Sequence, residues 1–142
     1  MHLFSILSSI AALASLQPIL AQTTPTSYYE TTYSARYSDG GASVDILTCG
    51  AQLAAEGYTT IGSIGSNIAG FVNVTSPNSS LCGECFVLEY AGAFLNIIVV
   101  DTASDGFVTT QAAYDNWVGS LAGQKPIPPS VDARVLGGPS NC

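Results

Sequence analysis

Residues Leu81–Gly106 read LCGECFVLEYAGAFLNIIVVDTASDG and predict the central hairpin of the fold. Two runs rich in aromatic and β-branched residues, Phe86–Tyr90 and Phe94–Val100, flank a glycine-containing turn at Ala91–Ala93. Runs of this kind around a short turn are typical of adjacent strands in an all-β domain. We therefore expect the rest of the chain to be organised around this hairpin.

The N-terminus has the pattern of a secretory signal. Residues 3–20 are mostly apolar, and Ala21 offers a small residue for cleavage. We interpret residues 1–21 as a signal peptide and residues 22–142 as one mature domain, so the protein is expected to be secreted and to have no membrane contact after cleavage. His2 stands where Lys or Arg is usual, which leaves an uncleaved anchor as the alternative.

The mature chain contains no histidine, because His2 is the only one in the sequence. This absence excludes Ser-His-Asp triads, Cys-His pairs and His-based metal sites. We predict neither a metal nor a cofactor.

Four cysteines in a small secreted chain predict two disulfides, for which three pairings are possible. A bond between Cys82 and Cys85 would close a tiny loop and would constrain little. We favour the pairs Cys49–Cys82 and Cys85–Cys142, with the crossed arrangement as the alternative. A redox role for the Cys-Gly-Glu-Cys motif requires a reactive thiolate, and a cysteine zinc site requires reduced thiols, so secretion argues against both.

Charged side chains are few, and the excess is acidic, with ten Asp and Glu against three Lys and Arg. Nucleic acids and anionic membranes are poor partners for such a chain, because phosphate binding requires clustered cations. A neutral ligand such as a polysaccharide fits this charge balance better.

The remaining pattern predicts several short strands and little helix. The helical features are a turn at 52–56 that ends at Gly57, and a helix over 109–118 that begins at Thr109 or Thr110. The expected strands cover 42–49, 58–64, 68–74 and 131–136.

Two surface features follow from short motifs. Asn73-Val74-Thr75 and Asn78-Ser79-Ser80 are N-glycosylation acceptors, which predicts a surface loop there in a secreted protein. Four tyrosines near the mature N-terminus can either pack at the rim of the core or stack on sugar rings; they are Tyr28, Tyr29, Tyr33 and Tyr37.

Taken together, these motifs resemble the cerato-platanin family of small secreted fungal proteins. The resemblance covers essentially the whole mature chain. It is carried by Tyr28-Tyr29, Tyr33, Val44–Cys49, Gly57–Gly62, Cys82-Gly83-Glu84-Cys85-Phe86, Val99-Val100-Asp101, Gly106-Phe107 and Ser140-Asn141-Cys142.

The resemblance implies a mainly β fold: a single-domain double-ψ β-barrel of about six strands, with one or two short helices and the two disulfides favoured above. It also implies a secreted or wall-associated protein that binds chitin or N-acetylglucosamine oligomers, and in some cases cellulose. Loosening of wall polysaccharides and recognition by a plant receptor as a defence elicitor are further implied activities. We expect a monomer that can self-assemble at interfaces.

The resemblance places Asp101 in a shallow sugar-binding groove, to which we also assign Asn96, Tyr33 and Tyr58. The alternative for Asp101 is a structural carboxylate at a strand end that accepts N–H groups of the following loop. Hydrolysis of a glycosidic bond requires a second carboxylate, and the candidates are Asp45, Glu84 and Glu89.

Three functions therefore remain open. The one we favour is a sugar-binding, wall-acting or elicitor protein with no catalytic residue. The alternatives are a weak glycan hydrolase that uses Asp101 and a structural protein that assembles at the wall or at an air–water interface.

Overall fold

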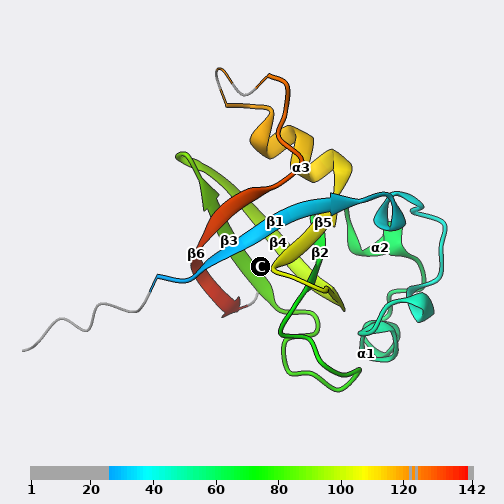
Figure 1. The fold of residues 1–142 in the computed structure, drawn as a ribbon. Helices are drawn as coiled ribbons and strands as arrows, with labels where there is room; N and C mark the ends of the chain where they lie inside the picture. The colour runs from blue at the N-terminus through cyan, green and yellow to red at the C-terminus, as the bar shows by residue number, and fades with distance from the viewer. Residues whose placement is uncertain (1–25, 122, 124, 141–142) are drawn as a thin grey trace, which may run out of the picture.

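A computed structural model of the chain describes residues 26–121, 123 and 125–140 (Figure 1). The predicted signal peptide and Cys142 lie outside the described residues. Six strands form a closed barrel in the order β1-β5-β2-β4-β3-β6, so the fold is mainly β as expected. The strands are β1 (Tyr28–Ser34), β2 (Ile68–Phe71), β3 (Cys85–Tyr90), β4 (Ala93–Thr102), β5 (Phe107–Thr110) and β6 (Val131–Ser140).

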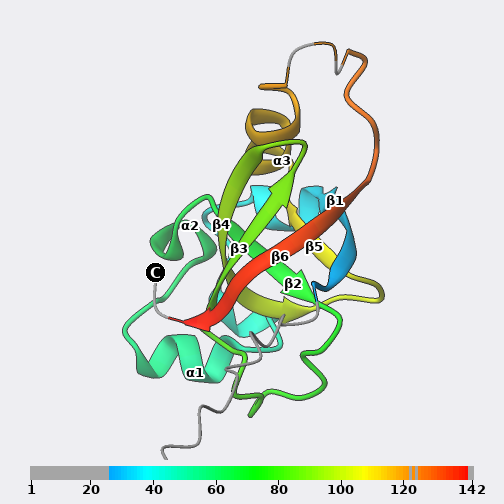
Figure 2. The same ribbon diagram turned by 90° about the vertical axis from the view of Figure 1, so that its left-hand side faces the viewer.

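Two of the strand pairs are parallel, namely β1 with β5 and β2 with β4, and the other pairs are antiparallel. The first strand of the barrel thus lies between the last two in sequence. Figure 2 shows β6 crossing one side of the barrel, beside the β3–β4 hairpin. This arrangement is the predicted double-ψ barrel.

The central hairpin is confirmed. Tyr90 pairs with Ala93, which leaves Ala91 and Gly92 as a two-residue turn with φ angles of 49° and 85°. Positive φ at both central positions is characteristic of a type I′ turn, whose twist suits a hairpin.

Aromatic rings fill one region of the barrel interior. Phe71 and Phe107 stack with ring centroids 4.1 Å apart and an interplanar angle of 2°. Tyr29 meets both rings edge-on, and Phe86 is tilted against them. Because aromatic side chains bury large apolar areas, this cluster contributes much of the core of a small domain.

The described residues form three short α-helices and two 3-10 turns. They are α1 (Gly50–Ala55), α2 (Ile61–Ile64), α3 (Gln111–Val118), η1 (Ala35–Ser38) and η2 (Val44–Ile46). The predicted 52–56 and 109–118 helices correspond to α1 and α3, and Thr110 is the N-cap of α3, accepting the N–H of Ala113. Within the described ranges, no helix has both the length and the apolar character needed to cross a membrane.

The prediction of a strand over 42–49 is wrong. Ser43 caps η2 by accepting the N–H of Asp45, and Leu47 bonds back to the carbonyl of Val44. Val44 and Leu47 are buried at a spacing of three while Ile46 is 49% exposed, which is the period of a tight helical turn. The alternation of apolar residues was therefore misleading.

The prediction of a strand over 58–64 is also wrong. Thr60 and Ser63 form a capping box, in which each side chain accepts a backbone N–H of the other residue. That local pairing begins α2 at Ile61 and competes with strand formation. The strand predicted over 68–74 forms only in its first half, as β2.

One disulfide is confirmed directly, because Cys49 and Cys82 are bonded. It links the start of α1 to the segment before β3, and it excludes the crossed pairing. Cys85 is also disulfide-bonded. Because Cys142 lies outside the described residues, the pair Cys85–Cys142 stays a prediction.

Candidate functional site

Asp101 lies near the end of β4 and is almost completely buried, with 1% of its surface exposed. It sits where β2 and β4 shift register between Ala69 and Gly70. A side chain at Gly70 would collide with the Thr102 carbonyl at 2.5 Å and with the Tyr37 hydroxyl at 2.7 Å. Glycine at position 70 therefore creates the space in which the Asp101 network forms.

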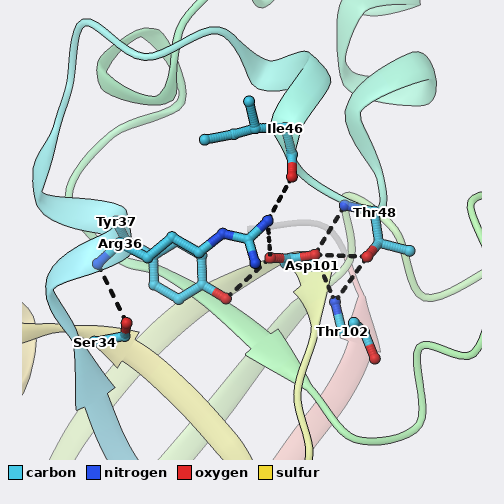
Figure 3. A network of polar contacts seen from close by, with 7 residues as sticks. All are labelled: Ser34, Arg36, Tyr37, Ile46, Thr48, Asp101 and Thr102. Carbon is cyan, nitrogen blue, oxygen red and sulfur yellow. Dashed lines mark hydrogen bonds and ion pairs between the residues drawn. The ribbon is translucent and has the colours of Figure 1, made fainter.

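One carboxylate oxygen of Asp101 accepts hydrogen bonds from Thr48 and Thr102 (Figure 3). Oδ1 accepts the Thr48 N–H at 2.8 Å, the Thr48 hydroxyl at 2.6 Å and the Thr102 N–H at 2.9 Å. These bonds fix the segment between η2 and α1 against the end of β4. Asp101 therefore has the structural role that the sequence analysis gave as its alternative, because it accepts N–H groups at the end of its strand.

The other oxygen, Oδ2, faces Arg36 and Tyr37 of η1. The Tyr37 hydroxyl donates to it at 3.3 Å, and the Arg36 guanidinium forms an ion pair at 3.4 Å. The same guanidinium nitrogen of Arg36 also donates to the Ile46 carbonyl. Figure 3 shows Arg36 extended between that carbonyl and Asp101. Because the Arg36 side chain is 51% exposed, it presents positive charge at the surface above the buried carboxylate.

Burial raises the pKa of Tyr37 well above its usual value, and the adjacent charge of Asp101 raises it further. Both effects disfavour a phenolate, because the negative form would lose solvation and repel Asp101. Tyr37 is therefore a neutral hydrogen-bond donor across the physiological pH range.

A surface hollow of about 330 Å³ lies next to this network, and Tyr37 belongs to both. Ser38, Gly40, Ser66 and Thr110 are among its other lining residues. The hollow is lined by apolar atoms, hydroxyls and backbone, and no described lining residue is charged. A small neutral ligand with hydroxyl groups suits such a lining.

The four residues assigned to the groove are not in direct contact with one another. No hydrogen bond, ion pair or ring contact among the described residues joins Asp101, Asn96, Tyr33 and Tyr58 to one another. Tyr33 is 36% exposed and its ring lies 5.1 Å from that of Tyr114, whereas Tyr58 is half-buried after α1. Asn96 is exposed on β4 in a second hollow.

Two of the three carboxylates considered as partners of Asp101 in hydrolysis have other side-chain contacts, whereas the half-buried Glu84 side chain has none among the described residues. Asp45 binds Ser43, and Glu89 pairs with Arg134 at 3.0 Å and accepts the Gly92 N–H. Within the described part of the chain, no carboxylate is among the contacts of Asp101. The described residues also contain no group of three or more metal-binding side chains.

The two glycosylation motifs lie in the connection between β2 and β3. Asn73 and Asn78 are both exposed, although the Asn73 amide also contacts the Tyr29 hydroxyl at 3.5 Å. Their surface position agrees with the predicted loop, and attachment of a glycan stays a prediction.

Sequence reasoning missed the partners of Asp101. Arg36, Tyr37 and Thr48 precede it by more than 50 residues and lie in or beside 3-10 turns. One signal was available: Arg36 is one of only three basic residues in the chain, and a scarce cation is a natural partner for a buried carboxylate.

The chain forms a closed, disulfide-bonded barrel of six strands, with a polar network at one end and a shallow hollow beside it. These features define a small double-ψ barrel protein. The sequence profile described as cerato-platanin matches residues 29–137. The chain therefore belongs to the cerato-platanin family. Members of this family are small secreted fungal proteins.

Individual relatives agree with this assignment. The allergen Asp f 15 of Aspergillus fumigatus is 28% identical over 94 residues, which cover 63% of this chain and 62% of the relative. The solved cerato-platanin 3 of M. perniciosa is 25% identical with a TM-score of 0.67, covering 78% of this chain and 95% of that one.

A further solved structure supports the fold alone. The solution structure of the fungal elicitor cerato-platanin is 24% identical with a TM-score of 0.58, covering 76% of this chain and 86% of that one. The barrel architecture is thus shared at low sequence identity.

Proposed function

We propose that the protein is secreted to the extracellular space or cell wall and binds chitin-type oligosaccharides without hydrolysing them. Its sugar-binding surface is the hollow beside Tyr37, together with the exposed Arg36 side chain. The observation that carries this proposal is the buried Asp101 network, which holds Arg36 and Tyr37 rigidly next to an uncharged, hydroxyl-lined hollow. Preorganised polar groups reduce the entropic cost of binding a small ligand.

The geometry of Asp101 supports a non-hydrolytic role. A glycosidase acid must reach the glycosidic oxygen and usually works with a second carboxylate. Both Asp101 oxygens are instead occupied by internal donors, and the side chain is 1% exposed. We assign Asp101 a positioning role, in which it acts on a sugar only through Arg36 and Tyr37.

We further propose two activities that follow from sugar binding. They are the elicitation of plant defence and the loosening of wall polysaccharides. The support for elicitation is that one solved structure of similar fold is described as a fungal elicitor. A host receptor, where one acts, would recognise the exposed surface of the monomer. Cellulose is a second neutral polymer that fits the same uncharged hollow.

The proposal is tested by NMR titration of the mature protein with N-acetylglucosamine tetramer. We expect amide shifts at Tyr37, Ser38 and Gly40 at millimolar ligand, and no release of reducing sugar over hours of incubation with chitin. Tyr28, which is 64% exposed and lies outside the hollow, serves as the internal control residue. A titration with no shift at any residue would remove the binding function, and release of sugar that Asp101→Asn abolishes would favour a hydrolase.

A further inference from the structure

We propose that Asn73 carries an N-linked glycan, and that the first N-acetylglucosamine of this glycan packs against the ring of Tyr29. The inference depends on secretion, which is one part of the proposed function, and goes beyond sugar binding to a covalent modification. Neither Asn73 nor Tyr29 lines the hollow beside Tyr37, so the modification site and the proposed binding site are separate.

Asn73 lies in a tight turn that directly follows β2. The Val74 N–H donates to the Phe71 carbonyl at 3.0 Å, which closes a four-residue turn with Asn73 at its third position. Asn73 is exposed, and so is Thr75, which completes the acceptor motif, whereas Val74 between them is buried. The turn therefore presents both functional residues of the motif to solvent, while Val74 anchors it in the core.

Tyr29 is the aromatic residue beside this turn. Its hydroxyl lies 3.5 Å from the Asn73 amide nitrogen, which is a long hydrogen bond. Its ring is only partly buried and stands nearly perpendicular to the rings of Phe71 and Phe107, at 84° and 83°. Part of the Tyr29 side chain is thus left at the surface, at the edge of the aromatic core and next to Asn73.

The modification adds a sugar to the atom that already faces Tyr29. In the secretory pathway, Nδ2 of Asn73 attacks the anomeric carbon of a lipid-diphosphate-linked oligosaccharide. A C–N bond forms, the bond from that carbon to the diphosphate oxygen breaks, the lipid diphosphate leaves, and the amide gives up one proton.

The first sugar then begins one covalent bond from Nδ2, within reach of the Tyr29 ring. An aromatic ring offers an apolar face to the apolar side of a sugar, while the tyrosine hydroxyl stays available for hydrogen bonding. The attached sugar therefore covers the exposed part of Tyr29 and stabilises the aromatic end of the barrel.

Asn78 provides an internal comparison in the same loop. It is also exposed, at the third position of a turn that the Ser79 N–H closes by donating to the Ser76 carbonyl at 3.1 Å. Its side chain forms no hydrogen bond within the described ranges, whereas that of Asn73 faces Tyr29. A glycan on Asn78 therefore extends into solvent and adds no stability.

The test measures occupancy and stability together. The mature chain is secreted from a yeast host behind a host leader, and an endoglycosidase trims each glycan to a single N-acetylglucosamine. Peptide mass spectrometry should find this sugar on Asn73. Thr75→Ala and Ser80→Ala are matched variants at exposed positions, because each removes one acceptor motif and keeps its asparagine.

We expect Thr75→Ala to lower the Tm of the trimmed protein by about 2–5 °C. Ser80→Ala should leave it within about 1 °C of the wild type. The same three proteins made in the bacterial periplasm, where disulfides form but this glycan is not added, give the effect of each alanine alone. There, all three should have the same Tm.

The contact with Tyr29 has its own measurements. NMR spectra of the trimmed wild type should show Overhauser contacts between protons of the sugar on Asn73 and protons of the Tyr29 ring. In a Tyr29→Leu background, Thr75→Ala should no longer lower the Tm, because the two changes remove the same interaction. If Tyr29→Leu does not fold, the Overhauser contacts decide the question.

Three results would overturn this inference. They are an unmodified Asn73 in the secreted protein, a Thr75→Ala variant with the Tm of the trimmed wild type, and a sugar on Asn73 with no Overhauser contact to Tyr29. None of them bears on sugar binding beside Tyr37. Conversely, a failed titration with the N-acetylglucosamine tetramer would leave the modification of Asn73 standing.

Discussion

The hydroxyl of Tyr37 donates a hydrogen bond to Oδ2 of Asp101, which joins a 3-10 turn near the N-terminus to the end of β4. The two residues are 64 positions apart in sequence. Together with Arg36 and Thr48, this bond ties two separate segments, η1 and the connection between η2 and α1, to one buried carboxylate on β4. This network gives the barrel a rigid polar end, and its stability can be measured.

Asp101→Asn should lower the free energy of unfolding by about 1–3 kcal/mol, because the amide nitrogen would place a donor against Arg36 and leave a buried interaction unmade. Urea denaturation measures this change. Asp45→Asn is the control, since Asp45 is exposed and should change stability by less than about 0.5 kcal/mol. Equal stability of the two variants would contradict the role assigned to Asp101.

Gly70→Ala should destabilise the barrel by about 1–3 kcal/mol, because the added methyl group would overlap the Thr102 carbonyl and the Tyr37 hydroxyl. Gly137→Ala is the matched control on β6, where a Cβ would meet only a Val87 methyl group at 3.8 Å. Thermal unfolding of both variants tests the difference. A Gly70→Ala protein as stable as Gly137→Ala would show that the β2 strand can move away without cost.

Stability should fall as pH rises from 10 to 12, partly because of Tyr114. Burial raises the pKa of Tyr114 to about 12, so above pH 10 the unfolded chain loses this proton before the folded protein does. The contribution of Tyr114 is complete below pH 10 and is lost as pH rises through 12. A shift of this size corresponds to about 2–3 kcal/mol.

Tyr114→Phe should therefore have a flatter stability profile between pH 10 and 12. It should also lose about 1 kcal/mol at neutral pH, because Tyr114 donates a hydrogen bond to the Pro128 carbonyl at 3.0 Å. Tyr28→Phe, at an exposed position, should retain the wild-type profile. If both variants showed the same dependence of stability on pH, the loss of stability between pH 10 and 12 would come from groups other than Tyr114.

Replacing both Cys49 and Cys82 by alanine should lower the free energy of unfolding by about 3–4 kcal/mol. The bond spans 33 residues, and its loss restores freedom to the unfolded chain. Guanidinium denaturation of the secreted variant measures the change. If the free energy of unfolding fell by less than about 1 kcal/mol, non-covalent contacts alone would be sufficient to hold α1 against the barrel.

The hairpin and the helix α3 could be predicted from sequence because their signals are local. Residues 86–90 and 94–100 combine strong β propensity with a turn that requires positive φ, and Thr110 is a favourable N-cap. For the hairpin and α3, short-range chemistry and the final fold agree. The small loop argued only against a Cys82–Cys85 bond, so the choice between Cys49–Cys82 and the crossed pairing is settled by the structure.

The strands β1 and β5 were not predicted, because little in them is aliphatic. In β1 only Thr31 is buried, and β5 buries Thr109, whose hydroxyl donates to the Ile68 carbonyl at 2.7 Å. Buried threonines with internal hydrogen bonds give no apolar alternation. The surroundings of Asp101 were missed for a related reason, since they depend on long-range contacts between irregular segments.

The position of β1 in the barrel has a consequence for biosynthesis. This strand is made first, yet its neighbours are β5 and β6, which are made near the end. During translation both edges of β1 therefore lack their native partners until residues 107–110 and 131–134 have emerged. Barrel closure is a late, non-local event, and until then the nascent chain exposes strand edges that a chaperone can protect.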